Sequence, residues 1–116
     1  MNTVNIYGIK SCSTMKKATD WLQANEITFE FHDYKKLGIE ADTLKGWLAK
    51  APWDQLINKR GTTWRKLSDE DKENIDDDKA IKLMLENTSL IKRPLLAINE
   101  TIHLGFKSEQ YEQIFN

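Results

Sequence analysis

The sequence contains a single cysteine, Cys12, among its 116 residues. One thiol cannot form a disulfide within the chain, so an internal disulfide framework is excluded. The first residues also lack a basic stretch followed by an apolar run, and we expect no signal peptide. Both absences favour a reducing compartment, and we expect a cytoplasmic protein.

Long apolar runs and an excess of basic charge are missing as well. No segment reaches the roughly 18 consecutive apolar residues of a membrane-spanning helix. The formal net charge is -1, whereas nucleic-acid-binding surfaces usually carry a basic excess. We therefore predict no membrane segment and no direct nucleic-acid binding. The length favours one domain over residues 1–116, and we expect a monomer.

Several motifs of known sites are also absent. The chain has no Gly-rich phosphate loop and no serine nucleophile elbow. His32, His103 and one cysteine do not have the spacing of a zinc ligand set, and we expect solvent-facing histidines and no bound metal. The acidic residues 69–78 lack the pattern of a calcium loop and indicate a solvated surface.

The first third of the chain has the pattern of a strand, a helix and a second strand. Val4 and Ile6 alternate with other residues, which predicts a strand that ends near Gly8. From Thr14 the apolar period becomes helical, and this helix ends near Asn25. Its predicted buried face consists of Met15, Ala18 and Leu22. A half-buried strand is predicted from the alternation of Ile27, Phe29 and Phe31. Two strands joined by a helix are expected to be parallel.

Residues 33–38 are predicted to be a loop, and residues 40–90 to be helical without a strand. Pro52 ends one predicted helix and opens a short one that stops near Gly61. Ser68 and Asp71 form a helix start signal, and the last helix of this segment ends near Asn87. The predicted apolar faces are Leu44, Trp47, Leu48 and Ala51; Trp53, Leu56 and Ile57; and Ala80, Ile81, Met84 and Leu85.

Strand character returns near the C-terminus. Residues 95–98 form a continuous apolar run that predicts a central strand, and residues 99–100 are short enough for a hairpin turn. Residues 101–104 pair back, and Ser108 begins a last helix. The predicted fold class is therefore α/β, with the order β-α-β, a helical insert over about residues 40–90, and β-β-α.

Cys12 lies in the predicted turn between the first strand and the first helix. The first N–H groups of a helix have no intrahelical partner and carry roughly half a positive charge, which favours a thiolate. Lys10, Lys16 and Lys17 add positive charge nearby. Cysteines in such positions can have pKa values of about 3.5 to 7.5. We interpret Cys12 as a thiolate nucleophile, and the same N–H groups can hold an oxyanion.

The alternative is that Cys12 is an inert buried residue, as free cysteines often are. Its neighbours Ser11, Ser13 and Thr14 are polar, which favours the reactive interpretation. Thr14 either caps the helix or donates a hydrogen bond to the sulfur.

Four stretches resemble the family of glutaredoxin-linked arsenate reductases, the regulator Spx and their YffB-like relatives. They are Tyr7–Ile9 with Cys12–Ala18, residues 58–67, residues 90–94 and residues 105–109. They span nearly the whole chain, and the Tyr-Gly-Ile before the cysteine with the two lysines after it are closest to the YffB-like branch. The resemblance implies a thioredoxin-like fold for the β-α-β and β-β-α segments.

The resemblance also implies site residues. Cys12 matches the nucleophile, and Arg93 matches an arginine that binds the oxyanion in arsenate reductases. Arg93 would pair with an oxyanion or a glutathione carboxylate, or it is a surface arginine without a ligand. The resemblance implies a cis Pro94, whereas the sequence alone favours a trans proline that starts a strand. The implied oxyanion- or glutathione-binding residues are Lys10, Ser11, Ser13, Thr14, Asn58, Arg60, Arg93, Pro94 and Lys107.

Three departures from the family pattern bear on the substrate. Asn58 aligns with the second oxyanion-binding arginine, although Arg60 lies two residues later, and Phe106 aligns with the third, beside Lys107. These changes argue against arsenate as the native substrate. Met15 stands where Spx has a second cysteine, so an internal disulfide switch cannot form.

The resemblance implies a monothiol reductase that uses Cys12 on an oxidised or oxyanion substrate. It would bind no cofactor and would take its electrons from glutathione, as co-substrate, or from glutaredoxin. The alternative is a non-enzymatic Spx-like regulator that binds the RNA polymerase α-subunit. The four tryptophans are more often core residues than ligand platforms, and only Trp64 lies between basic residues.

Overall fold

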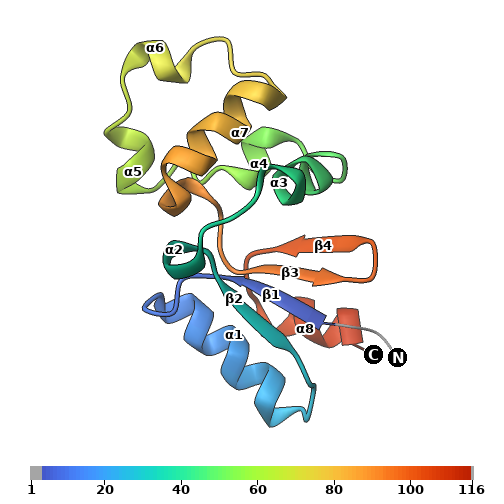
Figure 1. Ribbon diagram of the computed structural model, residues 1–116. Coiled ribbons are helices and arrows are strands. Elements are labelled where there is room, and N and C mark those ends of the chain that lie inside the picture. Colours follow the sequence, from blue (N-terminus) through green and yellow to red (C-terminus); the bar gives the residue numbers. More distant parts are fainter. Residues whose placement is uncertain (1–3, 116) are drawn as a thin grey trace. The chain divides into compact units, whose positions relative to one another are not determined.

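The computed structural model describes residues 4–115. Within this range the chain forms two compact units (Figure 1). The first contains residues up to 36 and from 93 onward, and the second contains residues 37–92. Cys12 and Arg93 both belong to the first unit.

The first unit is built on a four-stranded sheet. Its strands are β1 (Val4–Gly8), β2 (Glu30–Asp33), β3 (Leu95–Ile98) and β4 (Thr101–Leu104). The order across the sheet is β2-β1-β3-β4. The β1–β2 pair is parallel, as predicted, and the β1–β3 and β3–β4 pairs are antiparallel. The apolar run at residues 95–98 is therefore a central strand, as its composition predicts.

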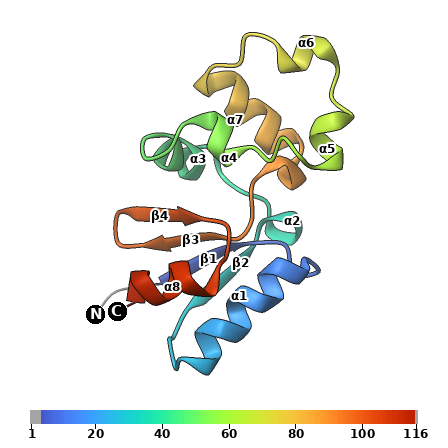
Figure 2. The same cartoon turned by 180° about the vertical axis from the view of Figure 1, so that it is seen from behind.

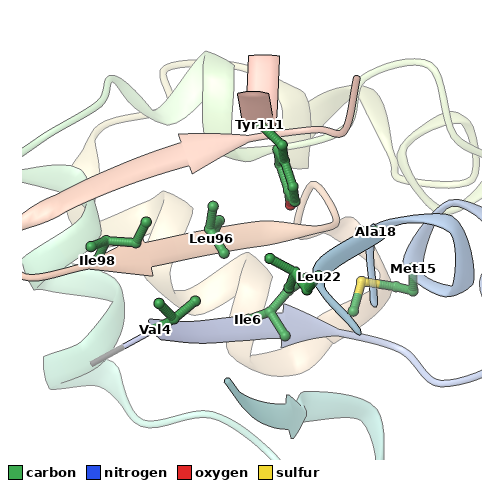
Figure 3. Packing of buried hydrophobic residues seen from close by; sticks show 8 residues of the cluster. All are labelled: Val4, Ile6, Met15, Ala18, Leu22, Leu96, Ile98 and Tyr111. Atoms are coloured by element: carbon green, nitrogen blue, oxygen red, sulfur yellow. The ribbon is translucent and has the colours of Figure 1, made fainter. Parts of the chain in front are cut away.

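Two helices supply the hydrophobic core beside this sheet. They are α1 (Ser13–Ala24) and α8 (Ser108–Phe115). The predicted face of α1 is buried, and Tyr111 of α8 is fully buried in the same cluster. Figure 3 shows this cluster, in which side chains of α1 and α8 meet those of β1 and β3. Its buried members are Val4, Ile6, Met15, Ala18, Leu22, Leu96, Ile98 and Tyr111.

The hairpin between β3 and β4 turns at Asn99 and Glu100, as predicted. Asn99 has φ 56, a left-handed conformation that asparagine tolerates better than most residues. Gly105, with φ 78, ends β4 and donates its N–H to the carbonyl of Pro94 at 2.9 Å. This bond ties the end of β4 to the residue that precedes β3.

The second unit is helical, as the sequence predicts. Its elements are α3 (Ala41–Leu48), α4 (Trp53–Leu56), α5 (Thr62–Arg65), α6 (Asp69–Lys72), α7 (Asp77–Glu86) and the 3-10 helix η1 (Thr88–Leu90). Figure 2 shows α7 beside these shorter helices from behind. Ser68 caps α6 by accepting the N–H of Asp71 at 3.1 Å, which confirms the predicted start signal. An isolated bridge between Ile57 and Ile91 is the only extended pairing among the described residues of this unit.

The strand predicted from Ile27 to Phe31 begins only at Glu30. Glu26 has φ 59, so the backbone turns after α1, and residues 27–29 lie between this turn and the start of β2. Phe31 is 37% exposed rather than half-buried, because β2 is an edge strand.

The predicted loop 33–38 is also wrong, since it contains the helical turn α2 (Tyr34–Leu37). Asp33 explains the turn: its Oδ1 accepts the N–H groups of Lys35 at 3.0 Å and Lys36 at 3.1 Å. An aspartate that satisfies these unpaired N–H groups is a typical helix start. Gly38, with φ 76, follows the turn.

The predicted apolar faces need three smaller corrections. α3 ends at Leu48, so Ala51 lies beyond it. α4 ends at Leu56, and Ile57 pairs with Ile91 instead of continuing the helix. In α7, Leu83 is buried whereas Leu85 is 40% exposed.

The order of elements and the mixed sheet confirm the predicted α/β, thioredoxin-like fold. No helix in residues 4–115 is long and apolar enough to cross a membrane. The prediction of one domain with a helical insert stays a prediction.

Candidate active site

Cys12 is the N-cap residue of α1, with extended backbone angles of φ -76 and ψ 128. Its N–H donates to the carbonyl of Ile9 at 3.1 Å, and its carbonyl accepts the N–H of Lys16 at 3.1 Å. These two bonds fix the turn that Gly8 and the polar residues after it initiate. The Cys12 side chain is half-buried, and no side chain caps the first turn of α1. The first N–H groups of the helix are therefore available to the sulfur.

The surroundings of the sulfur lower the pKa of the Cys12 thiol. Burial alone would raise this pKa, but backbone hydrogen bonds from Met15 and Thr14 and the hydrogen bond and charge of Arg93 outweigh burial. Each of these groups stabilises the thiolate more than the neutral thiol. Cys12 thus has the low-pKa, partly exposed environment typical of reactive cysteines.

Arg93 reaches the sulfur from the start of β3. The Arg93–Pro94 peptide bond is cis, as the family resemblance implies. Pro94 is buried and Arg93 is partly buried. The helix N-terminus and Arg93, two residues before β3, thus meet at the thiol, because β1 and β3 are neighbours in the sheet.

Tyr34, at the start of α2, was not predicted to belong to the site. Its side chain is 1% exposed and hydrogen-bonded to the Arg93 side chain. Burial, opposed by the charge of Arg93, raises the pKa of Tyr34 to about 12, so the phenol is neutral at pH 7. Tyr34 and Cys12 both contact Arg93, so the guanidinium is held between the phenol and the sulfur.

The sequence did contain a signal for Tyr34. It follows Asp33, the last residue of β2, and the corresponding end of the parallel strand β1 leads to Cys12. The carboxyl ends of adjacent parallel strands lie at the same edge of a sheet. The prediction of a loop over these residues concealed this placement.

One prediction about the surroundings of the thiol is wrong, and the two alternatives for Thr14 are resolved. The cation that lowers the thiol pKa is Arg93 rather than the neighbouring lysines. Lys16 pairs instead with Asp20 at 2.9 Å, one turn along α1. Of the two alternatives for Thr14, capping of the helix is excluded because no side chain caps α1, whereas the hydrogen bond to the sulfur is present and is donated by the Thr14 backbone N–H.

The other candidates from the first unit lie at its surface. Ser11 and Ser13 flank Cys12 and are exposed. Lys10 has an exposed side chain, while its backbone N–H donates to the Oδ2 of Asp33 at 3.3 Å. Lys107 is exposed and precedes α8. A binding role for these residues stays a prediction.

Asn58 and Arg60 belong to the second unit. The Oδ1 of Asn58 accepts the Arg60 N–H at 3.1 Å, and the Asn58 N–H donates to the carbonyl of Leu90 at 2.8 Å. Asn58 therefore stabilises the turn that displays the exposed Arg60 side chain. Their predicted part in anion binding stays a prediction.

Trp64, the tryptophan that lies between basic residues in the sequence, also belongs to the second unit. It stacks on Trp53 with ring centroids 6.4 Å apart. Lys59 lies 4.9 Å from the Trp53 centroid, and Lys72 lies 5.7 Å from that of Trp64. The two indoles and two ammonium groups stabilise one another in a partly exposed cluster.

The fold and this site define a thioredoxin-fold protein with one cysteine at a helix N-terminus, facing an arginine before a cis-proline. The profile of the ArsC family matches residues 7–114, and the chain belongs to this family.

Three relatives illustrate the family. The solved structure of a YFFB protein is 44% identical, with a TM-score of 0.91 and coverage of 96% of this chain and 97% of the other. The solution structure of an arsenate reductase (ArsC) related protein from Brucella melitensis is 48% identical, with a TM-score of 0.79 and coverage of 98% and 95%. The global transcriptional regulator Spx of Streptococcus mutans is 26% identical over 109 residues, which cover 92% of this chain and 79% of the relative.

Proposed function

We propose that this protein is a cytoplasmic monothiol reductase that uses Cys12 and takes its electrons from glutathione or glutaredoxin. The observation that carries the proposal is the Cys12 sulfur, which accepts hydrogen bonds from Thr14, Met15 and Arg93 and has a lowered pKa. Such an environment raises the fraction of thiolate at a given pH, and the thiolate is the nucleophile of thiol–disulfide exchange.

The reaction requires two exchanges, because the chain has no second thiol. In the first, the Cys12 thiolate attacks the glutathione sulfur of a mixed disulfide, forms a new S–S bond and releases the substrate thiolate, which takes a proton from water. In the second, a glutathione thiolate attacks the Cys12-bound glutathione. Oxidised glutathione leaves and the Cys12 thiolate returns. The net reaction consumes one glutathione and reduces one mixed disulfide.

Each group at the site has a role in these exchanges. The N–H groups of Thr14 and Met15 stabilise Cys12 as the thiolate in the free protein and as the leaving group in the second step. Arg93 stabilises the same charge, and its guanidinium geometry also fits a carboxylate of glutathione or an oxyanion. Tyr34, hydrogen-bonded to Arg93, limits the orientations of the guanidinium.

The direct test is reduction of the mixed disulfide of glutathione and 2-mercaptoethanol, with oxidised glutathione removed by glutathione reductase. The wild-type protein should consume glutathione in step with the mixed disulfide, and Cys12→Ser should not. Equal rates in the presence of wild type, Cys12→Ser and buffer would reject the proposal.

The similarity to Spx supports a second candidate, a non-enzymatic regulator that binds the RNA polymerase α-subunit. Such binding does not require the thiol. Retention of the full-length chain by immobilised α-subunit, to the same extent for wild type and Cys12→Ser, would favour this candidate.

A further inference from the structure

The carboxylate of Asp33 connects two backbone segments at one edge of the sheet. Asp33 is the last residue of β2 and lies opposite Gly8, the last residue of β1. Its Oδ1 accepts the N–H groups of Lys35 and Lys36 in α2. Its Oδ2 accepts the N–H of Lys10, in the turn that follows β1, at 3.3 Å. One side chain therefore links the start of α2 to the segment that leads into α1.

The segment that contains Lys10 also contains the proposed nucleophile. Lys10 lies two residues before Cys12, between β1 and α1. The N–H of Cys12 donates to the carbonyl of Ile9, whose side chain is buried, at 3.1 Å. The turn is thus held from within by this bond and from β2 by Asp33. Its conformation determines where α1 begins and, with it, where the N–H groups that bind the Cys12 sulfur lie.

The segment on the other side of Asp33 reaches the same sulfur. Tyr34 follows Asp33 directly and is fully buried, so the start of α2 determines where the phenol lies. This phenol is hydrogen-bonded to the Arg93 side chain, which is in turn hydrogen-bonded to the Cys12 sulfur. The contacts therefore form a closed ring around the sulfur, in which one branch is the turn after β1 and the other is the Tyr34–Arg93 pair. Asp33 is the residue at which the two branches meet.

The charge of Asp33 cannot by itself stabilise the thiolate. A carboxylate close to a thiolate disfavours the charged form and raises the thiol pKa. Burial also raises the pKa of Cys12, and the groups that lower it are backbone N–H groups in the first turn of α1 and the Arg93 guanidinium; Asp33 is not among them. Any contribution of Asp33 to the site is therefore geometric. Hydrogen bonds from backbone N–H groups to a carboxylate are charge-assisted and stronger than neutral ones, so they are suited to holding two segments in place.

Resting on the proposed use of Cys12 as a nucleophile, we propose that Asp33 is a positioning residue for the thiol. Its carboxylate holds the turn after β1 and the start of α2 at a fixed separation. The first N–H groups of α1 and the Arg93 guanidinium, which Tyr34 orients, therefore converge on the sulfur. Asp33 acts through these two segments rather than on the reacting atoms, so its substitution should change the ionisation of Cys12 through geometry.

Two substitutions at Asp33 test the proposal in the full-length protein. Asp33→Ala removes all three hydrogen bonds. Asp33→Asn keeps one acceptor oxygen and replaces the other with an NH2 donor, so only one of the two segments stays attached. The readout is the rate of iodoacetamide alkylation of Cys12 across a pH series. Asp33→Ala should raise the midpoint and slow alkylation at pH 7 by about three- to tenfold, with Asp33→Asn between it and wild type.

The direction of the change separates positioning from charge. Loss of a negative charge near the sulfur would by itself lower the midpoint, so a raised midpoint in Asp33→Ala supports positioning. An unchanged or lowered midpoint in this variant would overturn the proposal. If Asp33→Ala does not fold, the midpoint of Asp33→Asn decides by the same criterion.

Asp76 is the matched control for the loss of a helix cap. It caps α7 in the second unit, where its Oδ1 accepts the N–H of Lys79 at 2.8 Å. Asp76→Ala also removes a carboxylate that satisfies a helix N–H group, and it should leave the Cys12 midpoint unchanged. A shift equal to that of Asp33→Ala would show a general effect of lost stability and would overturn the positioning role.

Failure of this proposal and failure of the reductase function are distinguishable, because alkylation requires no turnover. If wild type reduces the 2-mercaptoethanol mixed disulfide but Asp33→Ala keeps the wild-type midpoint, the positioning role is wrong and the reductase function stands. If Asp33→Ala raises the midpoint but wild type reduces nothing, Asp33 positions the thiol and the reductase function is wrong.

Discussion

Arg93 is the one cationic side chain among the groups that lower the pKa of the Cys12 thiol. Arg93→Ala should raise this pKa and slow alkylation of Cys12 at pH 7 several-fold. Arg93→Lys should give an intermediate value, because lysine restores the charge without the planar guanidinium. The measurement is the rate of iodoacetamide alkylation across a pH series. Lys92→Ala is the control, since Lys92 is the adjacent exposed cation, and an equal effect in that variant would contradict the assignment.

The same pKa predicts how Cys12 changes stability with pH. The folded thiol has a lower pKa than the unfolded thiol, whose value is about 8.5. Between the two values the unfolded chain binds a proton that the folded chain does not, so the free energy of unfolding rises with pH. The contribution is complete above about 8.5 and is lost as pH falls through the folded value. Urea denaturation in reducing buffer should show this rise for wild type relative to Cys12→Ser; parallel curves would be inconsistent with a lowered pKa.

Tyr34 makes a separate prediction, because it acts on the thiol through Arg93. Tyr34→Phe keeps the buried ring and removes the hydrogen bond to the guanidinium, which should cost about 1 kcal/mol of stability. It should also change the pKa of Cys12 measured by alkylation, which loss of packing alone would not do. Tyr7→Phe, at a partly buried tyrosine of β1, should leave this pKa unchanged. An unchanged pKa in Tyr34→Phe would make Tyr34 a packing residue only.

At this scale the sequence identified Cys12 and Arg93 but not Tyr34. The position of Cys12 followed from a local change of period, and that of Arg93 from the family resemblance. Tyr34 required knowledge that Asp33 starts a helical turn at the end of an edge strand. The lysines near Cys12 in the sequence were predicted to lower its pKa, but the cation that does so is Arg93. Closeness in sequence does not give the distance of a side chain from the sulfur.

The packing of α1 against β1 depends on the close approach of Met15 to Gly8. A Cβ at Gly8 would collide with the Sδ of Met15 and lie 2.9 Å from its Cγ. Gly8→Ala should therefore destabilise the protein by about 1–3 kcal/mol through overpacking. The backbone N–H of Met15 binds the Cys12 sulfur, so displacement of this turn should also slow Cys12 alkylation at pH 7.

Gly46 is the matched control for this prediction. It lies inside α3, and a Cβ there meets no atom within 4 Å. Gly46→Ala should stabilise the protein by about 0.5–1 kcal/mol, because alanine favours the helix. Denaturation midpoints measure both variants, and a neutral Gly8→Ala would show that α1 does not depend on this contact.

Elements with a complete local pattern were predicted well. α1, α7 and β3 follow from apolar periodicity, and the cap of α6 follows from Ser68 and Asp71. β2 was predicted too early because alternation does not reveal that Glu26 turns the backbone first. The exposure of Phe31 depends on the order of the strands, which no local pattern contains.

For the whole molecule, the family and the α/β fold could both be predicted, whereas the substrate could not. Motifs distributed over nearly the entire chain carry the family, and the profile match over residues 7–114 agrees with them. Asn58 and Phe106 replace two arginines of the arsenate reductase pattern, so we expect no turnover of arsenate under conditions in which the mixed disulfide is reduced. Arsenite formation at a comparable rate would contradict this expectation.

The proposed reductase chemistry requires an ionised Cys12 sulfur at the start of α1, and the pH dependence of Cys12 alkylation tests this requirement most directly. In the wild-type protein, the iodoacetamide rate of Cys12 should rise with a midpoint clearly below the value of about 8.5 of a free thiol. A midpoint at or above about 8.5 would show that neither the helix N–H groups nor Arg93 stabilise the thiolate, and the proposed reductase chemistry would lose its basis.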